Sequence, residues 1–115
     1  SIEPHELPAE AALRELEEET GLRLDTLWVL PFVGMYYDVV HNTINAVPCF
    51  AGIVEHSTTI TLSREHSAYA WLTLLEAQNC LRIPSHRQAC LSFYDALLHP
   101  LERGESSLCA LYRRA

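Results

Sequence analysis

Long hydrophobic runs are missing from this chain of 115 residues, although 49% of its residues are hydrophobic. No apolar stretch approaches the roughly 20 residues that a membrane-spanning helix needs, and no secretory signal is visible. The length suits one small domain with a single modest core. We therefore expect a cytoplasmic protein without a membrane-spanning segment.

Positive charge is also scarce. Lys and Arg together number 8 against 15 Asp and Glu, and the formal net charge is −7. Nonspecific binding to DNA or to an acidic membrane needs a basic surface, so we expect neither. An acidic protein that acts on polyphosphates would need metal ions to offset the charge repulsion.

Paired cysteines of the CxxC type are absent, as is any Cys/His spacing typical of zinc sites. Cys49 lies within an apolar run, and Cys80 and Cys90 lie in helical patterns; Cys109 is the fourth. Buried free thiols in a reducing compartment explain this distribution better than disulfides do.

One stretch, Glu6 to Leu22, carries the clearest pattern in the chain. Pro8 suits the first turn of a helix, the interior is rich in strong helix formers, and Gly21 suits a left-handed cap. At about 100° per residue the helix has an apolar face and an acidic face. The apolar face is expected to contain Ala9, Ala12, Leu13 and Leu16, and the acidic one Glu15, Glu18 and Glu19 around Ala11.

The acidic face needs an explanation, because like charges three and four residues apart repel by about a few tenths of a kcal/mol per pair. Only Arg14 introduces positive charge at its edge. Hard divalent cations such as Mg²⁺ bind carboxylate oxygens, so the face could hold a metal. The three glutamates alone favour the simpler interpretation, an acidic surface exposed to solvent.

The complete spacing is more specific. Glu6 is followed by seven residues and then by Arg14-Glu15-Leu16-x-Glu18-Glu19-x-Gly21-Leu22. This resembles the Nudix box, G-x5-E-x7-R-E-U-x-E-E-x-G-U, in which U is aliphatic. Every position from the first Glu onward matches, and the leading Gly would precede Ser1.

The resemblance implies an α/β fold, an α/β/α sandwich with a mixed central sheet, whose first strands precede the box. Because those strands are not in the sequence, we expect that a segment is missing or that another chain completes the sheet. Residues 1–100 are expected to form the incomplete Nudix domain, and residues 101–115 a C-terminal tail without an assigned structure.

The rest of the chain predicts alternating strands and helices. The expected strands are Leu27–Tyr37 with a bulge at Pro31, Thr43–Glu55 buried on both faces with a bulge at Pro48, Thr59–Leu62 and Ala68–Leu72. The expected helices are Leu74–Leu81 and His86–Leu98, the second capped by Ser85 and ended by His99-Pro100.

A second informative stretch runs from Glu65 to Leu72 (EHSAYAWL) and on to the HRQA segment that begins at His86. It is similar to Nudix enzymes that cleave nucleoside-type triphosphates, most of all to dihydroneopterin triphosphate pyrophosphatases. Dinucleoside-polyphosphate hydrolases are a more distant likeness. The resemblance makes Glu65 an additional metal ligand, with Glu55 as its rival.

Several other side chains have two readings. His66 is either a general base or a solvated loop residue, and His86 and Arg87 either contact phosphate at a helix N-terminus or lie on an ordinary surface. Tyr69 and Trp71 would share one face of a strand, which we expect to be core. The aromatic residues Trp28, Tyr36 and Tyr37 could stack on a ring of the substrate, but core packing is expected for most of them.

The resemblance implies a Nudix pyrophosphohydrolase that uses Mg²⁺, or Mn²⁺, held by Glu15, Glu18, Glu19 and Glu65. Water would attack phosphorus in a nucleoside or pterin triphosphate, with release of pyrophosphate. Glu15 or Glu65 would be the base, Arg14 would orient a carboxylate, and Glu6 would fix the loop before the helix. The alternatives are a dinucleoside-polyphosphate hydrolase and a catalytically silent module that binds nucleotides or a protein. A homodimer is compatible with either.

Overall fold

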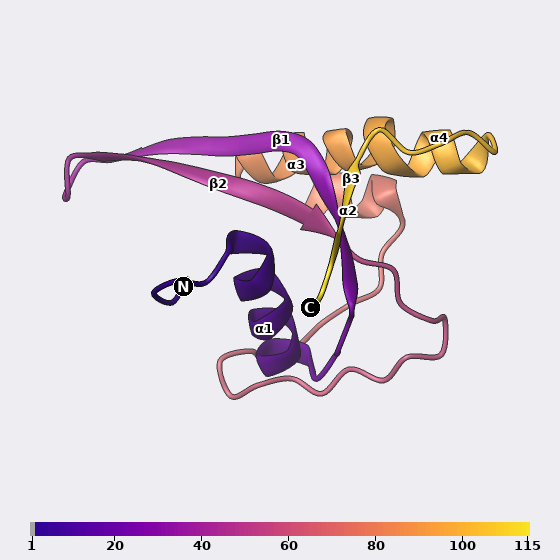
Figure 1. The fold of residues 1–115 in the computed structure, drawn as a ribbon, viewed down its shortest axis with the longest axis horizontal. Helices are drawn as coiled ribbons and strands as arrows, with labels where there is room; N and C mark the ends of the chain where they lie inside the picture. Colours follow the sequence, from indigo (N-terminus) through magenta and orange to yellow (C-terminus); the bar gives the residue numbers. More distant parts are fainter. Residues whose placement is uncertain (1) are drawn as a thin grey trace.

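A computed structural model describes residues 2–115 of the chain (Figure 1). Its elements are α1 (Pro8–Thr20), β1 (Thr26–Asp38), β2 (Thr43–Ala51), α2 (Leu74–Cys80), α3 (Pro84–Phe93), a π-helical turn (Tyr94–Leu98), α4 (His99–Glu102) and β3 (Ala110–Arg113). In Figure 1, α1 and the helices α2 to α4 lie on opposite sides of the β1–β2 hairpin. None of the helices in this part of the chain is long and apolar enough to cross a membrane.

The sheet has the strand order β2-β1-β3, and both pairings are antiparallel. The α/β class is therefore observed, but the expected mixed sheet is not found within residues 2–115. The reason is local, because a short turn joins β1 directly to β2, and such a turn makes neighbouring strands antiparallel. β3 pairs only with Thr26–Val29 of β1, so the tail contributes to the same sheet.

The bulge predicted at Pro31 is observed. The register between β1 and β2 shifts between Val29 and Val33, which places a bulge around Pro31, a residue that has no N–H for the ladder. The predicted bulge at Pro48 is wrong, since Pro48 pairs in register with Val33.

The prediction for β2 was wrong in two further respects. The strand ends at Ala51 rather than Glu55, and it is not buried on both faces. β2 is an edge strand, and the far part of the hairpin projects from the rest of the molecule, so side chains such as Ile44 and Val47 remain exposed. Tyr36 and Tyr37 of β1 are also exposed, contrary to the expected core packing, whereas Trp28 is half-buried.

The core is small and aliphatic. It consists of Ala9, Ala11, Leu13, Leu27, Leu30, Ala96 and Leu97. The predicted apolar face of α1 is observed at Ala9 and Leu13, while Ala12 and Leu16 are half-buried. The placement of Ala11 among the carboxylates was wrong, because Ala11 is only 2% exposed. Side chains two positions apart on a helix point in directions about 200° apart. Because Ala11 and Leu13 are both buried, α1 is covered on two sides.

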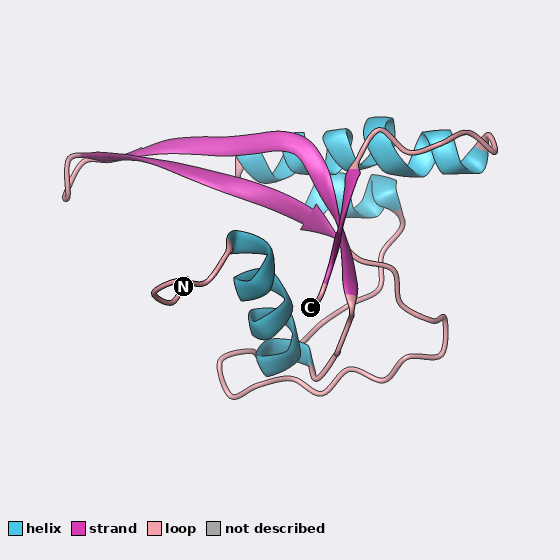
Figure 2. Ribbon diagram, in the orientation of Figure 1, coloured by secondary structure: helices cyan, strands magenta, loops and turns pink. Residues whose placement is uncertain are grey.

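Residues 52–73 form a long irregular connection (Figure 2). The strands expected at Thr59–Leu62 and Ala68–Leu72 are therefore not formed. The backbone of the first segment bonds to the end of α1 instead of to a strand, as described below. Tyr69 and Trp71 are more than half exposed, so the expected core role is wrong for both.

The helices after this connection form where they are predicted, but their first or last residues differ from the prediction. α2 is capped by Thr73, whose hydroxyl accepts from the Glu76 N–H. α3 starts at Pro84 after Ile83, rather than after Ser85, since proline fits a first helical turn. The helical path continues past His99-Pro100 to Glu102, because the π-helical turn places Pro100 in the first turn of α4.

The four cysteines are free thiols. Three of them, Cys49, Cys90 and Cys109, are only half-buried, and partial burial raises the pKa of Cys49. Cys80 is exposed, contrary to the expectation that all are buried, because it lies at the exposed end of α2.

Candidate metal centre

Helix α1 presents the acidic residues of the candidate site. Its first turn contains Pro8, and the Leu7 N–H is satisfied by the Glu10 carboxylate at 2.9 Å. At its other end Gly21 has φ 74° and donates its N–H to the carbonyl of Glu17 at 2.8 Å. Both ends of the helix are thus fixed, and burial of Leu13 orients the remaining faces.

A loop brings a further carboxylate to the end of α1. The N–H of Thr61 donates to the Thr20 carbonyl at 2.9 Å, and the N–H of Ser63 donates to the Glu19 carbonyl at 3.1 Å. A Cβ added to Gly21 would lie 3.3 Å from the Thr61 Cβ, so glycine allows this close approach. The loop then turns, with the His66 N–H bonded to the Ser63 carbonyl at 3.2 Å, and carries Glu65 to Glu19.

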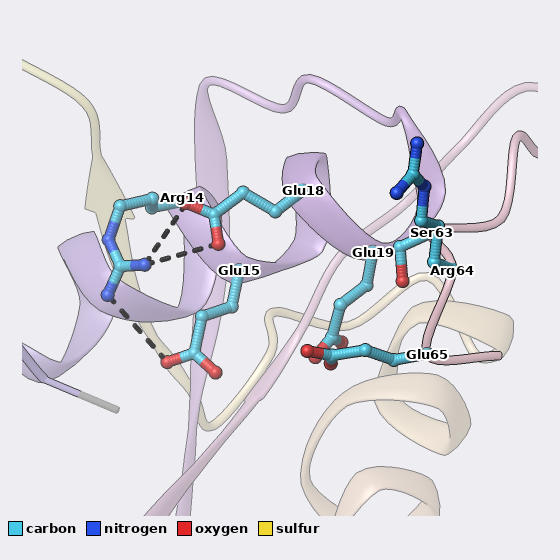
Figure 3. A pocket seen from close by; sticks show the side chains of 7 residues that line it. All are labelled: Arg14, Glu15, Glu18, Glu19, Ser63, Arg64 and Glu65. Atoms are coloured by element: carbon cyan, nitrogen blue, oxygen red, sulfur yellow. Dashed lines mark hydrogen bonds and ion pairs between the residues drawn. The ribbon is translucent and has the colours of Figure 1, made fainter.

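A surface cleft of about 420 Å³ lies between helix and loop (Figure 3). Its lining residues are Arg14, Glu15, Glu18, Glu19, Ser63, Arg64 and Glu65. The structure thus brings together all five residues that the sequence predicts as catalytic. It does not place Glu55 there, which leaves Glu65 as the loop ligand to be tested. The prediction lacked Ser63 and Arg64, whose only signal was their position next to Glu65.

Arg14 organises one side of the cleft. Its guanidinium bonds the Glu6 carboxylate through two nitrogens, at 2.9 and 3.1 Å, and approaches both oxygens of Glu18 at 3.2 and 3.3 Å. Glu15 lies 4.0 Å away. A forked pair of this kind fixes both partners, so Arg14 and Glu6 hold each other in one arrangement.

The ion pair between Arg14 and Glu6 also shifts the pKa values of both groups. The hydrogen bond from Arg14 lowers the pKa of Glu6 below its ordinary value, and the backbone N–H of Glu3 adds to the effect. The carboxylates of Glu6 and Glu18 in turn raise the pKa of Arg14. Arg14 therefore remains charged at any pH at which the protein is folded.

We expect Arg14→Gln to raise the pKa of Glu6 toward that of an unpaired carboxyl, because the charged donor is lost. A folded pKa below the unfolded one stabilises the protein above the unfolded pKa, and this contribution is lost as pH falls through the folded pKa. The variant should therefore lose less stability than the parent between about pH 5 and pH 3. Carboxyl-carbon NMR titration measures the pKa directly, and an unchanged Glu6 curve would contradict the assignment. Arg23→Gln, which removes an exposed pair with Glu17, is the control.

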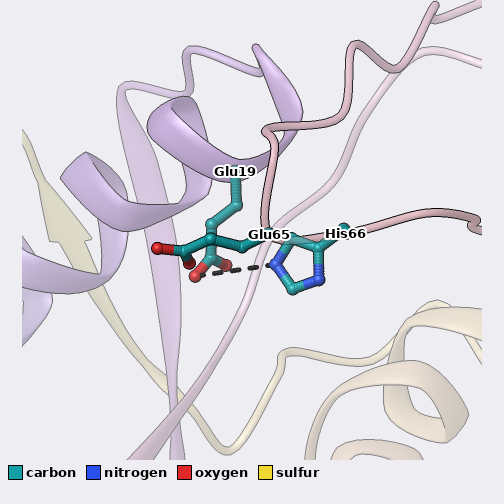
Figure 4. Close-up of side chains that lie close together, drawn as sticks. All are labelled: Glu19, Glu65 and His66. Atoms are coloured by element: carbon teal, nitrogen blue, oxygen red, sulfur yellow. Dashed lines mark ion pairs between the residues drawn. The ribbon is translucent and has the colours of Figure 1, made fainter.

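The other side of the cleft contains a second cluster. One ligand atom from each of Glu19, Glu65 and His66 lies within 4.8 Å of the others, and the His66 Nε2 is 3.9 Å from the Glu19 Oε1 (Figure 4). The predicted ligands are therefore divided, with Glu15 and Glu18 nearest to Arg14, and Glu19 and Glu65 next to each other (Figure 3).

These residues fit a divalent cation. Two like-charged carboxylates lie next to each other at the end of α1, and oxygen ligands of this type suit Mg²⁺ or Mn²⁺. Ser63 supplies a second observation, because its hydroxyl oxygen is buried and has no hydrogen-bond partner within residues 2–115. A buried hydroxyl needs a partner, which a bound water or a phosphate oxygen would supply.

His86 and Arg87, in the first turns of α3, do not line the acidic cleft. The Arg87 guanidinium donates to the carbonyls of Leu81 and Arg82, at 3.0 and 3.2 Å, and so satisfies the backbone after α2. His86 lines a small cavity beside Cys49 and Tyr36, away from the acidic cleft. These positions explain both residues without a contact to phosphate.

Comparison with known proteins was made for the whole chain. The family model of the NUDIX domain matches residues 1–93. The rat protein named bis(5′-nucleosyl)-tetraphosphatase [asymmetrical] is 30% identical over 111 residues, which cover 95% of this chain and 68% of the rat protein. Proteins of the same name from mouse and pig are 33% and 32% identical over 78 residues, which cover 66% of this chain and 53% of each relative. The chain thus spans about half to two thirds of their length.

Proposed function

Because the chain belongs to the Nudix hydrolases, we propose that it hydrolyses a phosphoanhydride bond of a dinucleoside polyphosphate. The relatives are named for the asymmetrical cleavage of a bis(5′-nucleosyl) tetraphosphate, and this favours the alternative over the nucleoside or pterin triphosphate of the main prediction. The HRQA likeness that led to the pterin substrate has a structural explanation here, in the bonds from Arg87 to the end of α2.

One observation carries the proposal. The carboxylates of Glu19 and Glu65, from a helix and from a distant loop, converge in an open cleft that is further lined by Glu15, Glu18 and two cationic side chains. Two carboxylates within 4.8 Å of each other repel, so the arrangement is most stable with a cation between them. A polyphosphate, which is itself an anion, could approach so acidic a cleft only with metal ions bound.

The residues of the cleft take complementary parts in the reaction. Glu19 and Glu65 would hold the cation, which would supply charge neutralisation at the phosphate oxygens and activation of water. Arg14 fixes Glu18 and Glu6, and so keeps the helix end in one arrangement. Glu15, at the cleft wall, accepts the proton of the attacking water; Glu65 is the alternative base. Arg64, which lines the cleft, offers positive charge to the polyphosphate.

The test is a substrate panel with the full-length protein and Mg²⁺ or Mn²⁺, analysed by ion-exchange chromatography. The panel contains a dinucleoside tetraphosphate, a nucleoside triphosphate and dihydroneopterin triphosphate. We expect the first to be cleaved fastest, into one nucleoside monophosphate and one nucleoside triphosphate. In isotopically labelled water, label in the monophosphate marks attack at the phosphorus next to the nucleoside.

Two results would overturn the proposal. Release of pyrophosphate from the triphosphates, without cleavage of the dinucleotide, would restore the substrate class that the sequence first suggested. Metal binding without hydrolysis of any member of the panel would favour the silent nucleotide-binding module.

A further inference from the structure

His66 is the one side chain of the metal-binding cluster that no expected ligand set includes. Its ring lies on the same turn as Glu65, and its Nε2 is 3.9 Å from the Glu19 Oε1 (Figure 4). Ligands on opposite sides of an ion at about 2.1 Å are about 4.2 Å apart, so this nitrogen is already within coordination range of a shared cation. All three ligand atoms lie within 4.8 Å of one another. Small rotations of the side chains would bring them to coordination distance from one ion.

The position of His66 is set by the backbone rather than by chance contact of a long side chain. The Ser63 N–H is bonded to the Glu19 carbonyl, and the His66 N–H to the Ser63 carbonyl. These bonds tie the turn to the last turn of α1, so Glu65 and His66 leave it toward the same carboxylate. Among residues 2–115, this is the only group of three or more such ligands that could hold a metal ion.

We propose that His66 supplies a nitrogen ligand to the cation held by Glu19 and Glu65, and that this biases the site toward Co²⁺ and Zn²⁺ over Mg²⁺. The inference rests on the proposed function, because it concerns the same metal centre. Its physical basis is ligand chemistry. Carboxylates suit Mg²⁺, Ca²⁺ and Mn²⁺, whereas imidazole binds later transition metals, whose affinities rise toward Co²⁺ and beyond.

The bias has a structural consequence for the cleft. With His66 bound, the cation would have one nitrogen and two oxygens of the chain as ligands, and Glu15 and Glu18 line the same cleft. Three ligands from the chain would leave room for water and for phosphate oxygens. Glu15 and Glu18, near Arg14, are then left to contact an ion that arrives with the substrate.

The test compares Co²⁺ and Mg²⁺ binding by calorimetry in the full chain and in three variants at one pH. His66→Gln removes the ring nitrogen, Glu19→Gln removes a carboxylate of the same cluster, and His56→Gln is the matched control in the same irregular connection. We expect His66→Gln to weaken Co²⁺ binding at least about tenfold, in line with losses at other metal sites, and Mg²⁺ binding less than about twofold. His56→Gln should change neither.

A direct readout separates ligation from a general effect on folding. Pulsed electron paramagnetic resonance of bound Mn²⁺ detects nitrogen coupling from a ligated imidazole. We expect this coupling in the parent and in His56→Gln, and its loss in His66→Gln, with an unchanged circular dichroism spectrum.

The outcomes distinguish this inference from the proposed function. If Glu19→Gln weakens Co²⁺ binding while His66→Gln retains both affinity and nitrogen coupling, the role of His66 is wrong and the carboxylate site stands. If neither variant changes binding, the cation is held elsewhere, and both the role of His66 and the metal centre of the proposed function are overturned.

Discussion

Hydrolysis is expected to fall by about 10²- to 10³-fold when Glu19 is replaced by glutamine. A cation that neutralises developing charge contributes several kcal/mol to the transition state, and a loss of about 3–4 kcal/mol corresponds to this change in rate. Glu19 is the residue to change because its carboxylate lies with that of Glu65, whereas Glu18 is bonded to Arg14. Glutamine keeps the size and the helix propensity of the side chain but not its charge.

The measurement is the steady-state rate at saturating Mg²⁺ and at a metal concentration series, with thermal unfolding to confirm the fold. Glu17→Gln is the matched control, since Glu17 is on the same helix, pairs with Arg23 and does not line the cleft. The control should retain the parental rate within about twofold. A fully active Glu19→Gln variant would exclude Glu19 as an essential ligand.

The second large effect is expected on the free energy of unfolding, when Leu13 is replaced by alanine. Leu13 is 1% exposed and is one of seven buried hydrophobic residues within residues 2–115, so Leu13→Ala should reduce the free energy of unfolding by about 3 kcal/mol. Domains of this size are stable by only about 5–15 kcal/mol, which makes the loss severe. The variant should also lower activity at physiological temperature, because the same helix carries Glu15, Glu18 and Glu19.

Urea denaturation measures the change, as a lower midpoint at an unchanged slope. Leu75→Ala is the matched control, because Leu75 lies in a helix but is 71% exposed, and it should cost less than about 0.5 kcal/mol. Equal losses in the two variants would mean that α1 is not anchored through Leu13.

The parts of the molecule that the sequence predicts well are those governed by local rules. Helix α1 follows from its helix formers, Pro8 and Gly21, and the bulge at Pro31 follows from a missing N–H. The cluster of acidic residues follows from helical periodicity. The spacing of these same residues indicates the family, and the family model of the NUDIX domain matches the region that contains them.

The errors concern pairings between distant segments. An extended run such as Thr59–Leu62 has the composition of a strand, but whether it pairs depends on a neighbour that the local sequence does not contain. β3 was missed for the same reason, since its partner, Thr26–Val29, lies at the other end of the chain. Ala11 was assigned to the wrong surroundings because periodicity gives the direction of a side chain and not what covers it.

The attachment of the loop to α1 has a consequence for how this site can evolve. Thr61 and Ser63 hold the loop through main-chain N–H groups, which every residue except proline provides. Substitutions in the loop can therefore alter what lines the cleft without moving Glu65 away from Glu19. The constraint falls instead on Gly21, whose left-handed backbone and missing Cβ permit the contact. Substitutions can thus accumulate in the loop, while its attachment to the helix depends on a single glycine in the helix cap.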